Sequence, residues 1–412
     1  MTDSTLDLNR RRLLKAGAIG GIAAPGFYVP AHAEEPTAPP ADDSVRRYAR
    51  LGKTGYEISD ISFGSSRLRS GEERLVHYAL DRGVNYIDTA ESYTSGQSET
   101  VIGNALKGRR DKVILASKQW ASADTTRAEM MHELEASLRR LQTDHIEIYF
   151  NHAVNAVDRL ENPEWHEFVA QAKAQGKIAY TGLSGHAGRL ADVLEVAIDK
   201  SLVDVVLVGY NFGQDPKFYE RITRSFDFVA RQPELPRLLK KAKDKGIGVV
   251  AMKTLMGARL NDMRAYEASG STYAQAAFRW TLGNADVDAL VVSMTDEAQI
   301  SEYLGASGAK ALAQGDMDLL RRYAVLNGAT YCKHACNDCS GACPVDVPIS
   351  DVLRTRMYAT DYQDIDFARS EYRALATNAS ACLGCSGAPC AGACPHGIDI
   401  SALCAPTHQL LA

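Results

Sequence analysis

The chain has 412 residues, of which 45% are hydrophobic and 24% are charged, and its formal net charge is −5. This composition is typical of a globular protein, and the length predicts either two domains or one large barrel with an appended module. The only basic block lies in the first fifteen residues, which argues against nucleic acid as the main partner.

The first 47 residues predict an export signal followed by a linker. Arg10–Arg12 form a basic region, Leu13–Ala24 a short apolar stretch, and residues 31–33 (Ala-His-Ala) a small-residue cleavage site. The apolar stretch is too short and too rich in Gly and Ala to favour a transmembrane helix. Residues 9–15, NRRRLLK, resemble a twin-arginine signal.

We therefore predict a signal peptide over residues 1–33 and a linker over 34–47. The predicted location is periplasmic, with the twin-arginine export machinery as a partner and cleavage near Ala33. Retention of an uncleaved signal as a membrane tether and a simple solvated basic tail are the alternatives.

Eight short apolar runs alternate with amphipathic stretches in the middle of the chain. The runs are residues 58–64, 84–89, 112–118, 145–152, 178–184, 203–211, 247–253 and 288–294. This alternation predicts an α/β fold of the (β/α)8 TIM barrel type, which we assign to residues 48–315. A doubly wound open sheet is the main alternative, but the segment GSSRLRSGEE after the first run lacks the Gly-rich phosphate loop of that fold.

Four ionisable side chains lie at or just after the ends of consecutive predicted strands, namely Asp88, Tyr93, Lys118 and His152. Alone, the first could be a helix cap, the third a rim charge and the fourth a core histidine. Together, at the rim where barrel chemistry gathers, they suggest proton transfer, with the ammonium lowering the pKa of the phenol. Such a set would protonate a carbonyl oxygen as hydride reaches its carbon, or act in reverse on an alcohol. Lys253 also ends a strand and is interpreted as a rim lysine without a catalytic part.

The segments NYIDTAESYTSGQSETVIGNAL, VILASKQW, DHIEIYFNHAV, GLSGH and GIGVVAMKTL resemble the aldo-keto reductases over roughly residues 48–310. The resemblance implies that Asp88, Tyr93, Lys118 and His152 form the catalytic tetrad of that family, with Tyr93 as the proton donor. It also implies a small carbonyl or alcohol as substrate.

The resemblance further implies a nicotinamide site after the fifth and sixth strands. Ser184 and His186 would contact the carboxamide, and Tyr210 and Asn211 would complete the site. Leu207 stands where a glutamine is usual in the family, and its side chain cannot hydrogen-bond a carboxamide. The segment SMTDEAQISEYLG carries acids but no base, so NAD(P)H is an expected cofactor without an evident site for a 2′-phosphate.

All nine cysteines lie in the last 81 residues, and eight of them form two similar motifs. The motifs are Cys332-x3-Cys336-x2-Cys339-x3-Cys343-Pro344 and Cys382-x2-Cys385-x4-Cys390-x3-Cys394-Pro395. Both end in the C-x3-C-P of bacterial ferredoxins, although each has an insertion elsewhere. We predict two 4Fe-4S clusters, with a disulfide framework or a zinc site as alternatives.

The spacer between the motifs has helical periodicity, which predicts a small, mainly α-helical, two-cluster ferredoxin-like domain over residues 316–412. The module resembles the C-terminal extension of iron–sulfur aldo-keto reductases. In two-cluster ferredoxins the fourth cysteine of each motif ligates the other cluster. That rule implies one cluster on Cys332, Cys336, Cys339 and Cys394 and another on Cys343, Cys382, Cys385 and Cys390. Cys404 is interpreted as a buried apolar thiol.

These observations predict an exported oxidoreductase whose barrel acts on a carbonyl or alcohol and whose clusters exchange electrons with a redox partner protein or electron carrier. One alternative is an exported electron-transfer subunit with a non-catalytic barrel, and another is a purely structural role for the clusters. The twin-arginine route carries folded proteins, so clusters inserted before export are compatible with the predicted signal.

Overall fold

The computed structural model describes residues 43–412 with these gaps: 187–188, 215–233, 257–262, 268–270, 309–310, 313, 328–331, 333–335, 337, 340 and 361–364. The predicted signal peptide and residues 34–42 of the linker lie outside the described residues. Within the described ranges, no helix is both long enough and apolar enough to cross a bilayer.

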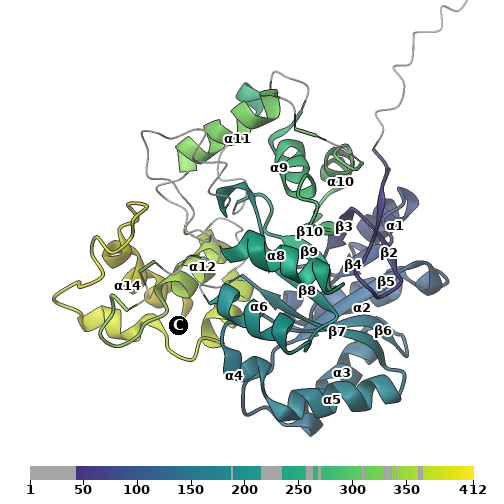
Figure 1. The fold of residues 1–412 in the computed structure, drawn as a ribbon, viewed down its shortest axis with the longest axis horizontal. Coiled ribbons are helices and arrows are strands. Elements are labelled where there is room, and N and C mark those ends of the chain that lie inside the picture. The colour runs from purple at the N-terminus through teal and green to yellow at the C-terminus, as the bar shows by residue number, and fades with distance from the viewer. Residues whose placement is uncertain are drawn as a thin grey trace, which may run out of the picture. The chain divides into compact units, whose positions relative to one another are not determined.

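Eight parallel strands close into a barrel in the order β10-β3-β4-β5-β6-β7-β8-β9 (Figure 1). They are β3 (Ile61–Gly64), β4 (Tyr86–Asp88), β5 (Ile114–Gln119), β6 (Ile146–Asn151), β7 (Ile178–Gly185), β8 (Val205–Gly209), β9 (Gly248–Met252) and β10 (Ala289–Ser293). Every predicted apolar run contains one of these strands or most of it, which confirms the barrel and excludes the open sheet. Strands β10 and β3 close the barrel by pairing in parallel, from Leu290 beside Ile61 to Ser293 beside Gly64.

The barrel is surrounded by the helices that follow its strands (Figure 1). They are α1 (Glu73–Asp81), α2 (Gln97–Ala105), α3 (Arg127–Leu141), α4 (Val157–Leu160), α5 (Pro163–Ala174), α6 (Leu190–Asp199), α8 (Glu234–Asp244), α9 (Tyr273–Leu282) and α10 (Glu297–Leu304). Short 3-10 turns are η1 (Tyr93–Gly96), η2 (Arg110–Lys112), η3 (Phe212–Gln214) and η4 (Arg264–Tyr266). Local sequence sets their limits: α3 begins at a capping box between Thr126 and Glu129 and ends at Gln142 in the left-handed conformation.

Two apolar layers stabilise the barrel. One lies between the strands and the surrounding helices, and the other fills the interior of the barrel. A hairpin of β1 (Tyr48–Arg50) and β2 (Glu57–Ser59) adds Leu51 and Ile58 to the inner layer. Its turn lies against the start of β9, because Lys53 N donates to Gly246 O at 2.8 Å. The hairpin therefore closes the end of the barrel opposite the C-terminal ends of the strands, and the polar side chains gather at those ends.

The C-terminal region is helical in its described part. It contains α11 (Gln314–Asn327), α12 (Ile349–Thr360), α13 (Ile365–Arg373), the 3-10 turn η5 (Ala379–Gly384) and α14 (Ile400–Leu411), and no strand is assigned among its described residues. Helix α11 packs on the barrel, where Tyr323 stacks on Tyr273 with ring centroids 4.1 Å apart. Helices α12, α13 and α14 pack on one another beside the barrel (Figure 1). The described residues from Asp43 to Ala412 form one compact unit, and a boundary near residue 315 stays a prediction.

Candidate active site and cysteine sites

The structure brings together the four side chains that the sequence placed at successive strand ends. Asp88 is the last residue of β4, Lys118 lies in β5, His152 follows β6 and Tyr93 opens η1. Each is at most 8% exposed. Because parallel strands end at one rim of the barrel, residues up to 64 positions apart meet here.

Lys118 lies at the centre of this set. Its Nζ donates to Asp88 Oδ2 at 2.7 Å and to the carbonyl of Thr89 at 2.6 Å, and it lies 3.4 Å from Tyr93 Oη. The His152 ring meets the Tyr93 ring edge to face, with centroids 5.8 Å apart. The phenol is thus flanked by an ammonium that is already held by a carboxylate and by an imidazole.

Burial controls the protonation states of the set. Burial raises the pKa of Tyr93 well above its usual value, and the negative charge of Asp88 raises it further. The lowered pKa expected from the sequence is therefore wrong, because burial outweighs the effect of the nearby ammonium. Burial, and next the charge of Lys118, lower the pKa of His152 well below its usual value, so the imidazole is neutral at pH 7.

The predicted nicotinamide residues divide between the rim and the outer shell. Ser184 Oγ accepts from the backbone N–H of Ala153 at 2.9 Å, and His186 follows directly after β7. The Tyr210 ring instead packs on Trp280 of α9 with centroids 5.1 Å apart, and its Oη accepts from Asn284 Nδ2 at 3.0 Å. These contacts link Tyr210 to α9, and its role toward a cofactor stays a prediction.

Two other features bear on a cofactor. Leu207 is fully buried in the apolar layer inside the barrel, so its role there is packing. At the first turn of α10, Glu297 forms an ion pair with Arg74 of α1 at 2.7 Å. Sequence reasoning did not consider Arg74, since it is more than 200 residues from α10 in the chain. Arg74 therefore places a basic side chain beside α10, whose own segment contains acidic but no basic residues.

Eight cysteines form two groups of four, and each group combines both motifs. In cysteine site I, Cys332, Cys336, Cys339 and Cys394 line one small cavity. Burial raises the pKa of Cys332 to about 12, and the negative charge of the other three thiolates also raises it. None of the nine cysteines is in a disulfide.

Cysteine site II consists of Cys343, Cys382, Cys385 and Cys390. Burial raises the pKa of Cys382, and the charges of the other three cysteines raise it further, so the four thiols are mutual neighbours. Cys385 is exposed, and the apolar side chain of Leu383 beside it is 53% exposed. Site II is therefore closer to solvent than site I.

Both sites suit an iron–sulfur cluster, since each offers four thiols in one place. Apolar side chains of Leu353, Ile398 and Ile400 line site I. Sequence reasoning missed two polar neighbours there: Asp338 and His396 have ligand atoms within 4.8 Å of each other and of Cys336 Sγ. The position of His396 directly after Cys394-Pro395 is the signal that could have identified it. Cys404 is 2% exposed and lies beside Cys382, without being a member of either group of four.

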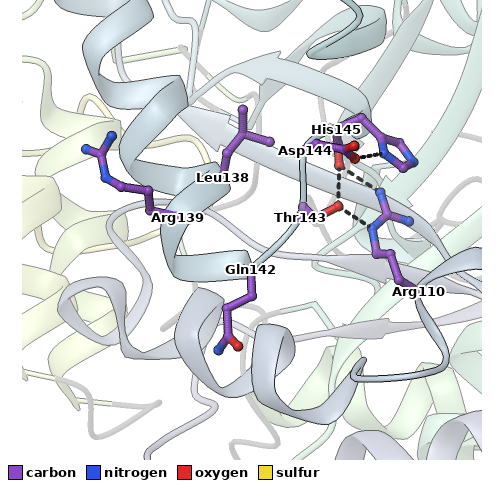
Figure 2. A pocket seen from close by; sticks show the side chains of 7 residues that line it. All are labelled: Arg110, Leu138, Arg139, Gln142, Thr143, Asp144 and His145. Atoms are coloured by element: carbon purple, nitrogen blue, oxygen red, sulfur yellow. Dashed lines mark hydrogen bonds and ion pairs between the residues drawn. The ribbon is translucent and has the colours of Figure 1, made fainter.

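A shallow depression of about 630 Å³ lies at the start of β6, far along the barrel from the strand ends that carry the tetrad. Figure 2 shows Arg110 reaching toward Thr143 and His145, with donor–acceptor distances of 3.1 and 2.8 Å. Arg110, Thr143, Asp144 and His145 bond one another there, and the tetrad lies at the other end of the barrel, so we do not place the chemistry in this depression.

The fold and these side chains define an oxidoreductase built on a parallel barrel. The family model described as "Aldo/keto reductase family" matches residues 61–269, and the chain belongs to that family. It is 24% identical over 303 residues to the oxidoreductase YqkF of Bacillus subtilis, and this match covers 67% of this chain and 96% of YqkF. It is 36% identical over 155 residues to the aldo-keto reductase YhdN of the same organism, and this match covers 33% of this chain and 46% of YhdN.

Solved structures share the barrel. The holo form of aldo-keto reductase AKR11C1 from Bacillus halodurans has a TM-score of 0.54 and 22% identity, and the match covers 67% of this chain and 95% of that one. An aldo-keto reductase from Klebsiella pneumoniae in complex with NADPH has a TM-score of 0.53 and 24% identity, with 68% and 95% covered. At this identity the similarity shows the fold.

Proposed function

We propose that this oxidoreductase interconverts a small carbonyl compound and its alcohol at the barrel rim, and that two 4Fe-4S clusters in its C-terminal region exchange electrons with a redox partner protein or electron carrier. The observation that carries the first half is the buried set of Tyr93, Lys118, Asp88 and His152. The observation that carries the second half is the division of eight cysteines into two groups of four.

Each barrel residue has a chemical task in this proposal. Tyr93 keeps its proton at neutral pH and donates it to the substrate oxygen. Neutral His152, whose ring lies against Tyr93, orients that oxygen. Lys118, held by Asp88, presents a fixed positive charge to the negative charge that develops on the oxygen. A bound nicotinamide would supply the hydride.

Ser184, His186, Tyr210 and Asn211 would hold that nicotinamide. The relative from Klebsiella pneumoniae binds NADPH, which supports NAD(P)H as the class of cofactor for this chain. The acids at the start of α10 and the ion pair of Glu297 with Arg74 leave the preference between NADH and NADPH to experiment.

The cysteine sites would hold the clusters with exchange between motifs, as the sequence predicts for a ferredoxin-like domain over residues 316–412. Cys332, Cys336, Cys339 and Cys394 would hold one, and Cys343, Cys382, Cys385 and Cys390 the other. Such clusters supply one-electron transfer. The free state of all eight cysteines supports this assignment over a disulfide framework.

One set of measurements on anaerobically purified protein tests the proposal. We expect about eight iron and eight sulfide per chain, an EPR signal after reduction, and binding of NADH or NADPH with carbonyl reduction that Tyr93→Phe abolishes. Absence of iron would contradict the cluster assignment. Absence of nicotinamide binding, with unchanged behaviour of Tyr93→Phe, would favour the electron-transfer subunit with a scaffold barrel.

We also propose export by the twin-arginine route to the periplasm, either with cleavage near Ala33 or with retention as a tether. Fractionation of cells that express the full chain tests this. Replacement of Arg10 and Arg11 by lysine should leave the protein in the cytoplasm, and unchanged export would contradict the assignment.

A further inference from the structure

A second carboxylate–tyrosine–lysine–histidine set faces the same barrel rim. Lys253 follows β9 and His186 follows β7, whereas Tyr358 comes from α12 and Glu371 from α13. Half of this set therefore belongs to the barrel and half to the C-terminal region. Its residue types are those of the tetrad, with glutamate in place of aspartate.

The contacts of the second set parallel those of the first. Lys253 Nζ donates to Tyr358 Oη at 2.5 Å and lies 4.4 Å from the ring centroid, while Lys118 Nζ lies 4.7 Å from the ring centroid of Tyr93. The His186 ring meets the Tyr358 ring edge to face at 6.4 Å, with Nε2 3.3 Å from Oη. A chain of hydrogen bonds thus links Lys253, Tyr358 and His186.

The backbone around Lys253 is held in an uncommon conformation. Lys253 has φ of +56°, which is unfavourable for a side chain with a Cβ. Asn211 Nδ2 donates to the Lys253 carbonyl at 3.0 Å, and Asn211 Oδ1 accepts from Gly213 N at 3.0 Å. Strain of this kind persists where the surroundings enforce it and is concentrated at functional sites.

Helix α12 connects this set to cysteine site I. Ser350, Arg354 and Tyr358 are spaced by four residues, so they lie along one face of the helix. Arg354 Nη2 contacts the carbonyl of Cys336 at 3.5 Å, and Cys332 Sγ contacts the carbonyl of Ser350 at 3.9 Å. The eight residue steps from Ser350 to Tyr358 span about 12 Å of helix.

We propose that Lys253 and Tyr358 are positioning residues of the active site, which restore to Tyr93 the proton that it gives to the substrate. This inference rests on the proposed carbonyl reduction. In each turnover a bound nicotinamide would supply hydride to the carbonyl carbon, and Tyr93 gives its proton to the carbonyl oxygen. Lys253 then passes a proton through Tyr358 toward the Tyr93 phenolate and is recharged from solvent.

The electrostatics agree with this role. The groups that face Lys253 are Arg354 and Tyr358 of α12, Glu371 of α13, and His152 and His186 of the barrel. Burial lowers the pKa of Lys253 to about 7, against the opposing charge of Glu371. In the tetrad, by contrast, burial raises the pKa of Tyr93 well above its usual value and lowers that of His152 well below its usual value. Tyr358 is close enough to raise the pKa of Tyr93.

The pH dependence of carbonyl reduction by the full, cluster-loaded protein tests the proposal. In the wild type kcat should fall as pH rises through about 7, because Lys253 loses its proton. Tyr358→Phe should lower kcat at pH 7 about tenfold and remove this inflection, with KM for the carbonyl changed less than twofold. Lys253→Gln should do the same.

Tyr372→Phe is the matched control, because Tyr372 is also a tyrosine of the C-terminal region bonded to a histidine. Its Oη lies 2.9 Å from His408 Nδ1 and takes no part at the barrel rim. The Tyr372→Phe variant should have a lower thermal stability, while the pH profile of its kcat should match that of the wild type. A wild-type profile in Tyr358→Phe, or an equal loss of kcat in Tyr372→Phe, would overturn the proposal.

A second measurement separates this inference from the proposed function. Brief acetylation with acetic anhydride between pH 6 and 9, followed by peptide mass spectrometry, reports the pKa of Lys253 without any turnover. A value near 7 that falls in Tyr358→Phe, because Lys253 then loses the acceptor of its hydrogen bond, supports the pair, and a value near 10.5 overturns it. If the wild type reduces no carbonyl with either nicotinamide, the proposed function fails, and the acetylation result alone decides whether the pair exists.

Discussion

The barrel and the C-terminal region hold their functional side chains in different ways. In the barrel, hydrogen-bonded strands and two apolar layers place Asp88 and Lys118 before any ligand arrives. In the C-terminal region, eight thiols gather among short helices and turns, with apolar side chains such as Val345 exposed at 55%. The difference indicates that the backbone organises the barrel site, and we propose that bound clusters would organise the two cysteine sites.

The largest expected effect is on catalysis in the barrel. Tyr93→Phe removes the proton donor but keeps the ring, so kcat for carbonyl reduction should fall by about 10²–10⁴-fold. Iron content and thermal stability should stay at wild-type values, because the phenyl ring keeps its packing against His152. Steady-state kinetics and metal analysis measure both, and residual activity within tenfold of wild type would contradict the assignment.

The next effect concerns the C-terminal region. Cys394→Ser should remove about half of the iron, because it takes one thiol from site I and leaves site II complete. Cys404→Ser is the matched control, since Cys404 is a buried neighbour of Cys382 that belongs to neither group of four, and it should leave the iron content unchanged. If Cys394→Ser destroyed the EPR signal of the other cluster and spared site I, the exchange between motifs would be wrong.

A third prediction tests the rigidity of the barrel site. Lys118→Met leaves Asp88 buried without its ion-pair partner, which should lower the free energy of unfolding by about 3–5 kcal/mol near pH 7. The loss should shrink in the variant that also carries Asp88→Asn, because no charge is then buried. Chemical denaturation of the single and double variants measures this, and equal stabilities would show that the pair is not needed to hold the site.

The smallest expected effect is a pH dependence of barrel stability. Burial raises the pKa of Glu91 from 4.5 to about 8, so between these values the folded chain holds a proton that the unfolded chain has lost. Stability therefore falls as pH rises from about 4.5 to 8. Glu91→Gln should be more stable than wild type by about 1–2 kcal/mol at pH 8.5 and equal to it at pH 4.

The partly exposed Glu135 provides the opposite case. Its hydrogen bond from Lys177 lowers its pKa, so its contribution to stability is present above the unfolded pKa and is lost as pH falls. Glu135→Gln should therefore lose stability at neutral pH and match wild type in acid. Thermal melts across the pH range compare the two variants, and the same sign for both would contradict the assignment for Glu91.

Much of the barrel could be predicted from the sequence because its signals are local. Each strand is a short apolar run, and the alternation of runs with amphipathic segments determines the order of the parallel sheet. Convergence of Asp88, Lys118 and His152 followed from that order alone, since parallel strands end on the same side. The pKa of Tyr93 could not be predicted, because burial outweighs the nearby ammonium and burial is a property of the packed structure.

Side-chain direction and distant partners were decided only by tertiary structure. Tyr210 lies near the end of a predicted strand, yet its ring contacts Trp280 in the outer shell. Arg74 reaches α10 from the first barrel helix. The sequence by itself determined the eight strand–helix units, the tetrad and the two cysteine motifs, because each depends on residue type at short spacing. Packing of α12 and α13 against the barrel brought Tyr358 to Lys253, since contacts between such distant residues depend on the way the helices dock.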